Sequence, residues 1–299
     1  MNFDESVRAA WQVHHEDLLA GLRHVESALR LVETAEHAQA FSRVAVHVVG
    51  EEAGDWPRST ALCRGALDRL GGAPAPLASL CDLAVAQAMA GDGLAALAAE
   101  SRAIEQEPAH LALILVRTRL GLASALARQD EWDASCVLSR AALAVWRQHA
   151  DAAIDRVVAA SANNLASALL EDPAEAVGRA CDLEALALAA KDAWGRIGDW
   201  TNSERADYLL AMTYRTLGRH SEARACAERG LVTIRANGME GVDAAFLQLE
   251  LAHAARALGD EGTAHAAEAA ALSLRASPAF EDAGLQRWFD ARLDVSRRR

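Results

Sequence analysis

The residues best suited to metal chemistry stand near the N-terminus, where His14, His15 and Glu16 are consecutive. Zinc proteases use the spacing HExxH, which is absent because Leu19 stands where the second histidine is required. On a helix, His14 would share a face with Leu18, which is typical of a surface or partly buried histidine. No ligand spacing is found among His37, His47, His110, His149, His220, His253 and His265. The sequence therefore predicts no metal site.

Nucleophilic and phosphate-binding chemistry also lacks its signatures. The five cysteines are far apart, form no CxxC pair and have no adjacent histidine, which fits reduced thiols in a cytoplasm. We expect four of them to be small buried hydrophobes in helix packing positions, namely Cys63, Cys136, Cys181 and Cys226. The patterns GxxxxGK[ST], GxGxxG and GxSxG are absent. The sequence predicts a protein that is not an enzyme and needs no cofactor.

The charge and hydropathy of the chain exclude several partner classes. Its formal net charge is -12, which argues against general affinity for nucleic acid or an anionic membrane. The most apolar run, from Leu111 to Val116, is followed by Arg117 and Arg119, and we expect it to be too short to span a bilayer. The N-terminus carries acids where a signal peptide needs positive charge. These features predict a cytoplasmic protein without nucleic-acid or membrane partners.

The elements that position any binding residue are predicted to be helical hairpins that recur along the chain. Around Gly218, Leu210-Ala211 and Tyr214 precede the turn, and Ala223 and Ala227 follow it. The same large and small residues return at the same offsets around Gly91, Asp130 and Gly259, and more weakly around Gly54 and Asp172-Pro173. Alanine dominates the apolar content, which favours tightly packed helices over sheets.

The turns carry helix-capping signals that agree with this pattern. A glycine just past a helix end suits a left-handed backbone, which is the role expected of Gly91, Gly218 and Gly259. Asp92 and Ser221 then stand where an N-cap is needed. Near residue 172 another arrangement is expected, in which Asp172 caps the helix, Pro173 takes its first position and Glu175 faces the helix dipole.

The recurring hairpin resembles the tetratricopeptide repeat, whose first helix alternates large and small residues and whose second begins with a small one. "AMAGDGLAALAAESRAIEQEP", from Ala88 to Pro108, is the most similar copy, and "YRTLGRHSEARACAERGL" is the next. The resemblance implies an all-α, right-handed α-solenoid of about seven hairpins and a capping helix. As one domain, 1–299 would comprise an N-terminal hairpin at 1–36, repeats at 37–278 and a cap with a basic tail at 279–299.

First helices of such a solenoid line its concave surface, and the resemblance therefore implies a set of groove residues. The predicted groove residues are Arg117, Ser124, Arg128, Asn163, Asn164, Ser167, Arg205, Tyr208, Met212, Arg215, Phe246, His253 and Arg256. Arginine can hold a carboxylate through two parallel hydrogen bonds, and the aromatic residues offer apolar contact beside it. Asparagine can hold a peptide backbone through its donor and its acceptor. The competing interpretation is that these arginines are simply solvated.

Two functions remain open at this point. The first is a scaffold whose concave face binds a segment of a protein or peptide partner, in which an acidic segment would pair with the arginines. The second is a ligand- or peptide-sensing domain of a bacterial regulator, because the repeat period of about 37–45 residues exceeds the usual length of about 34. The sequence does not identify the partner or the oligomeric state.

Overall fold

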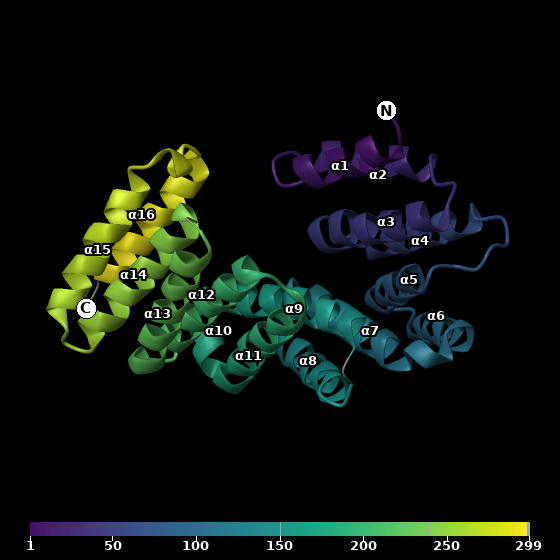
Figure 1. Cartoon of the computed structure of the whole chain (residues 1–299). Coiled ribbons are helices and arrows are strands. Elements are labelled where there is room, and N and C mark those ends of the chain that lie inside the picture. Colours follow the sequence, from purple (N-terminus) through teal and green to yellow (C-terminus); the bar gives the residue numbers. More distant parts are fainter. Residues whose placement is uncertain (150, 239, 298–299) are drawn as a thin grey trace. The chain divides into compact units, whose positions relative to one another are not determined.

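The computed structural model describes residues 1–149, 151–238 and 240–297, and over this part of the chain it consists of helices and connecting turns, with no strand (Figure 1). The chain separates into two compact units, residues 1–150 and 151–299, and each is described by itself. The described residues form seven helical hairpins and a final helix, so the predicted all-α class and hairpin array are confirmed. The single-domain organisation stays a prediction.

Unit 1 contains four hairpins. The first pairs α1 (Phe3–Val13) with α2 (Leu18–Leu29), and the third pairs α5 (Leu77–Met89) with α6 (Gly93–Gln106). In the second, α3 (Ala35–Val44) continues as the π-helix η1 (Ala45–Glu52) and pairs with α4 (Trp56–Asp68). The 3-10 turn η2 (Pro108–His110) then leads into α7 (Leu111–Ala127), which pairs with α8 (Trp132–Trp146). The first helices α3, α5 and α7 also pack in sequence against one another.

Unit 2 contains three hairpins and the cap. Helix α9 (Ala152–Leu169) pairs with α11 (Ala180–Ile197) after the short α10 (Pro173–Gly178). Helices α12 (Trp200–Thr216) and α13 (His220–Asn237) form the next hairpin, and α14 (Gly241–Ala257) and α15 (Glu261–Arg275) form the last. The 3-10 turn η3 (Pro278–Phe280) leads to the capping helix α16 (Ala283–Arg297), which packs on α14 (Figure 1). As in unit 1, first helices contact first helices.

Left-handed turn residues mark the hairpins where the sequence predicted them. Gly91, Gly218 and Gly259 have φ values of 85°, 70° and 79°. Asp130 occupies the same place in the fourth hairpin with φ 61°, and it is the one non-glycine residue with positive φ among the described residues. A side chain at such an angle is strained, although aspartate tolerates it better than most residues.

The predicted helix caps are confirmed except for one. The Asp92 carboxylate accepts the Ala95 backbone N–H at 3.0 Å, and Asp172 accepts the N–H groups of Ala174 and Glu175. Ser221 is not a cap, because α13 begins one residue earlier, at His220, and Arg219 takes the N-cap position without a side-chain bond. The prediction for Ser221 was wrong by two residues, an ordinary error for a helix start.

Small residues let the helices approach closely. Ala223 is completely buried, and a Cβ added to Gly230 would lie 2.8 Å from Cδ1 of Leu247 on the next first helix. The hairpin of α12 and α13 therefore needs small residues at these crossings. Burial of cysteine is confirmed for three of the four expected residues; Cys181, the second residue of α11, is exposed instead.

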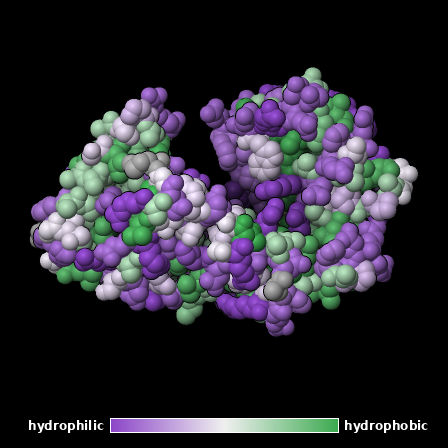
Figure 2. Space-filling model, in the orientation of Figure 1, coloured by the Kyte–Doolittle hydropathy of each residue, from purple (hydrophilic) through white to green (hydrophobic). Residues whose placement is uncertain are grey.

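The apolar stretch continues past Arg117 and Arg119 and is longer than the sequence analysis expected. Pro108–Ala127 is the one helix of the described chain that is apolar and long enough to cross a membrane. The core helix of a soluble protein satisfies the same criterion, and α7 packs between α5 and α8 with Ile114, Leu120 and Ala123 fully buried. The visible surface of both units is mostly hydrophilic, with scattered apolar side chains (Figure 2). The absence of a membrane partner stays a prediction.

Candidate functional site

The predicted groove residues of unit 1 are engaged with acidic side chains of the same unit. Arg117 on α7 donates to Oδ1 of the largely buried Asp82 on α5 at 3.1 Å. Burial raises the pKa of Asp82, and the guanidinium of Arg117 acts in the opposite direction. Arg128 lies 2.8 Å from Glu52 and 3.7 Å from Glu51, both at the end of η1. Arg117 thus joins two neighbouring first helices, and Arg128 joins α7 to the second hairpin.

The same arrangement holds in unit 2. Nε of Arg205 on α12 lies 2.8 Å from Asp243 on α14, and Nε of Arg215 lies 2.7 Å from Glu250 on the same helix. Arg256 reaches Glu268 on α15 at 2.9 Å. Only Arg205 among these three arginines is well exposed, with 58% of its side-chain surface accessible.

The partners of these arginines were missed in the sequence, although a signal existed. Arg117 and Asp82 are 35 residues apart, as are Arg215 and Glu250. Arg219 and Glu184 on second helices repeat the same separation. An acid one repeat away from an arginine thus indicates an ion pair between equivalent helices of successive hairpins. The expectation that the arginines stand ready for a ligand is corrected, because each of the five predicted arginines has an acidic neighbour inside the protein.

The polar groove residues of the fifth and seventh hairpins are more open. Asn164 on α9 is exposed, and the amide of Asn163 donates to its oxygen at 3.4 Å. Ser167 on α9 and Ser124 on α7 are half-buried. His253 on α14 is also half-buried, and its ring lies 5.9 Å from that of His220. The asparagine pair is available for backbone recognition but has no charged residue bonded to it.

The apolar groove residues divide into covered and open ones. Met212 is only 7% exposed, and Phe246 is 2% exposed because α16 packs over it. Both are therefore core residues that offer no open surface, which corrects their predicted role. Trp288 on α16 stacks against Phe246 with ring centroids 4.3 Å apart, and Trp288 remains 45% exposed. The capping helix thus covers Phe246, and Trp288 of that helix is the aromatic residue exposed at this place.

The residues Arg205, Tyr208, Phe246, Trp288 and Arg292 form what we call the C-terminal patch. Tyr208 lies 6.0 Å from Phe246, and the Arg292 guanidinium lies 5.8 Å from the Trp288 ring. The Tyr208 hydroxyl is buried and has no hydrogen-bond partner among the described residues. Burial strongly raises the pKa of Tyr208, so its hydroxyl stays protonated and can donate a hydrogen bond.

A protonated carboxyl group adjoins the C-terminal patch. Glu204 on α12 is fully buried, and burial together with the neighbouring Asp243 raises its pKa to about 9. Arg205 lowers the pKa of Glu204, but by less than burial and Asp243 raise it. Glu204 is therefore neutral at physiological pH, while Arg205 bonds to Asp243. Titratable groups with shifted pKa values are enriched at functional sites, which makes this end of α12 a candidate.

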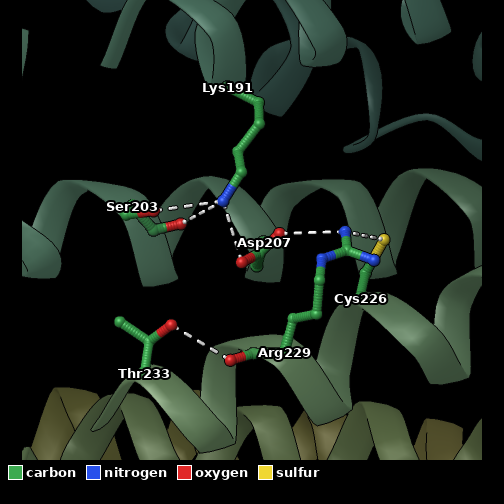
Figure 3. Close-up of polar contacts among 6 residues, drawn as sticks. All are labelled: Lys191, Ser203, Asp207, Cys226, Arg229 and Thr233. Atoms are coloured by element: carbon green, nitrogen blue, oxygen red, sulfur yellow. Dashed lines mark hydrogen bonds and ion pairs between the residues drawn. The ribbon is translucent and has the colours of Figure 1, made fainter. Parts of the chain in front are cut away.

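A second polar cluster joins three helices of unit 2 (Figure 3). Nζ of Lys191, the one lysine of the chain, lies 2.9 Å from the buried Asp207 and 3.1 Å from the backbone oxygen of Ser203. Arg229 donates to the other oxygen of Asp207 at 3.0 Å and contacts the sulfur of Cys226 at 3.1 Å. Asp207 on α12 is thus neutralised by two cations, one from α11 and one from α13. This arrangement holds the three helices together and leaves neither carboxylate oxygen without a cation.

Three of the cysteines have raised pKa values. Burial raises the pKa of Cys81 to about 12 and also raises that of Cys226, where Arg229 opposes the shift. Cys63 is fully buried, with its pKa raised by the same cause. Thiols of this kind stay protonated and unreactive at neutral pH.

Comparison with known proteins supports the fold. No protein-family model and no curated protein matches the chain. The chain is similar to BtubC (BKLC) from P. vanneervenii at 17% identity, covering 92% of this chain and 88% of that one, with a TM-score of 0.50. It is also similar to the apo quorum sensor NprR from B. thuringiensis, at 10% identity over 91% and 87% of the two chains, with a TM-score of 0.37.

A tetratricopeptide repeat protein from Parabacteroides merdae ATCC 43184 matches 98% of each chain at 13% identity, with a TM-score of 0.34. Sequence identities this low are evidence of a similar fold only. The hairpin array and its turns are those of a tetratricopeptide-type helical repeat protein.

Proposed function

We propose that the protein is a non-catalytic, cytoplasmic scaffold whose C-terminal patch binds a segment of a protein or peptide partner. The observation that carries this proposal is Trp288, which remains 45% exposed where it packs over Phe246 beside the Arg292 guanidinium. Exposed aromatic rings next to arginine are typical of the residues that dominate binding energy at interfaces. An apolar side chain of the partner would pack on the exposed part of Trp288.

The patch also suits an acidic residue of the partner. Asp243 bonds to Nε of Arg205, so the terminal nitrogens lie outside that bond on a side chain that is 58% exposed. Arg292 supplies a second cation beside Trp288. We therefore expect a partner segment with a carboxylate close to an apolar side chain. Arg215 and Arg256 are not part of this proposal, because their acidic partners already hold them in the protein interior.

The experiment is a selection of peptides from a random display library on the immobilised protein. Peptides that combine an aromatic or aliphatic residue with a nearby acid should be enriched. Each binder is then measured against Arg205→Glu and Trp288→Ala, and we expect affinity losses of about tenfold or more, as for residues central to an interface. The loss on Arg205→Glu should shrink in high salt because charge attraction is screened.

Two variants on second helices serve as controls. Arg224→Glu changes an arginine of α13 that also pairs with acids, Glu228 and Asp260. Leu188→Ala removes an apolar side chain of α11 that is 40% exposed, close to the exposure of Trp288. Both controls should bind like the unaltered protein. Equal affinity for the patch variants and the controls would show that the arginines are merely solvated and that binding occurs elsewhere.

A further inference from the structure

Unit 1 contains a cluster of ligand-type side chains that plays no part in the proposed peptide binding. His14, His47 and Glu52 each offer one ligand atom, and these atoms all lie within 4.8 Å of one another. His47 and Glu52 lie on the same segment η1, and the packing of the first two hairpins brings His14 to them across 33 residues of sequence. We propose that His14, His47 and Glu52 bind a divalent transition-metal ion, and that Zn²⁺ is the ion their chemistry favours.

The position of His14 is built into the first hairpin. His14 is the C-cap residue that directly follows α1, and it is only 4% exposed. Gly21 on α2 makes room for it, because a Cβ at Gly21 would lie 2.9 Å from Cβ of His14. His14 thus faces the protein interior, in contrast to the exposed His15 beside it.

The second half of the cluster comes from the π-helix. Segment η1 presents His47, Glu51 and Glu52 within its last turns, and all three side chains are at least three-quarters buried. The Trp11 ring stacks on His47 with centroids 4.8 Å apart, which fixes the plane of the imidazole. Short π-helical segments are uncommon and frequently occur at functional sites.

The hydrogen-bond partners determine which ring nitrogens carry protons. Nδ1 of His14 lies 3.1 Å from the backbone oxygen of Ala10, which can only accept, and Nδ1 of His47 lies 2.7 Å from a Glu51 oxygen. Both Nδ1 atoms are therefore donors, and the two Nε2 atoms face each other across 3.1 Å. If neither Nε2 carries a proton, their lone pairs point at each other, and a bound cation between them would relieve the repulsion.

A metal ion meets this requirement. Histidines that bind metals usually donate their other N–H to a carboxylate or a backbone carbonyl, as both rings do here. Tetrahedral Zn–N bonds of about 2.0–2.1 Å place two nitrogens about 3.3 Å apart, close to the separation observed.

The third ligand is shared with an arginine. Oε1 of Glu52 lies 3.8 Å from Nε2 of His47 and 2.8 Å from Nη1 of Arg128 on α7. A metal ion and Arg128 would therefore compete for this carboxylate. Arg128 is 46% exposed and is free to turn toward solvent. Two imidazoles and one carboxylate leave a fourth position for water, and the bound ion would tie the first hairpin to the second.

The test is Zn²⁺ titration of the chelator-treated full-length protein, followed by competition with a coloured chelator. We expect one Zn²⁺ per chain, with His14→Gln, His47→Gln and Glu52→Gln each weakening binding at least about tenfold. Zn²⁺ should also raise the melting temperature, and Mg²⁺, which prefers oxygen ligands, should not. Bound Co²⁺ should show the strong visible absorption of a four-coordinate site.

Two control variants make the result decisive. His24→Gln removes a partly buried histidine of α2 outside the cluster and should leave Zn²⁺ affinity unchanged. Arg128→Ala removes the competing cation and should keep or strengthen binding. Circular dichroism without metal shows whether each variant is folded. The proposal is overturned if the unaltered protein binds no Zn²⁺, or if folded His47→Gln binds it as tightly as His24→Gln does.

Discussion

At the scale of single residues, Glu204 makes unit 2 sensitive to pH. The ordinary glutamate pKa of about 4.5 rises to about 9 in the folded state, so the folded protein binds more protons than the unfolded chain between these values. Stability must therefore fall as the pH rises through this window, because the buried carboxyl group resists losing its proton. This sign is opposite to that of a carboxylate held by an arginine.

Glu204→Gln should remove this pH dependence. We expect the unaltered protein to lose about 1–3 kcal/mol of its free energy of unfolding between about pH 5 and pH 8, and the variant to lose less. Urea denaturation across this range measures the difference. Glu268→Gln is the control: Arg297 and Arg256 lower the pKa of Glu268, so its contribution is constant in this window. Parallel stability curves for the unaltered protein and Glu204→Gln would contradict the assignment.

Single residues also show why the site was only partly predictable. Arg205 and Tyr208 were recognised from their place in the repeat, and both lie at the C-terminal patch. Trp288 was not among the predicted groove residues, because its partial exposure depends on how α16 packs over Phe246. Glu204 carried no signal, because its pKa results from burial among α12 and α14 residues that only the folded chain assembles.

At the scale of elements, the turns between helices are the most predictable feature. Gly54, Gly91, Gly218 and Gly259 all adopt positive φ, and Asp130 adopts it in their place. In each of these hairpins the chain turns back at the same position after the first helix. The positive φ is therefore required by the turn and not by the type of residue found there. Asp130 therefore bears a strain that glycine would not.

Asp130→Gly should stabilise the fourth hairpin. Relief of the left-handed strain outweighs the greater freedom that glycine gives the unfolded chain, and we expect a gain of about 0.5–1 kcal/mol in the free energy of unfolding. Gly218→Ala is the reverse experiment, because a Cβ there meets no atom within 4 Å and only the φ of 70° opposes it. That variant should lose about 1–2 kcal/mol. Denaturant midpoints compare the two, and a loss of stability in Asp130→Gly would contradict the strain argument.

At the scale of the whole molecule, an array of hairpins needs a terminal element to cover its last apolar face. Helix α16 does this with Phe289 and Leu293, which join Phe246, Leu249 and Phe280 in one buried cluster. Helix α16 falls within the range 279–299 predicted for the cap and basic tail, and residues 298–299 of that range lie outside the described chain.

A chain ending at residue 278 should be less stable and more prone to aggregate. Truncation exposes Phe246 and Leu249, each now 2% exposed, and burial of a large apolar side chain contributes about 1.5–3 kcal/mol. We expect a lower melting temperature and stronger binding of a dye that reports exposed apolar surface. A chain ending at residue 297 is the control. If both chains melt and bind dye alike, α16 is not a structural cap.

The all-α class, the hairpin repeat and its turns could be predicted from the sequence, because periodic small residues and left-handed turn positions are local properties that recur. The sequence did not show which charged side chains have an oppositely charged partner inside the protein. Asp82, Asp243 and Glu250 neutralise predicted groove arginines only because equivalent helices of successive hairpins lie side by side. The same packing brings His14 to His47 across 33 residues, a contact that linear ligand spacing excluded. Pairing and burial depend on distances between helices, and only the tertiary structure sets those distances.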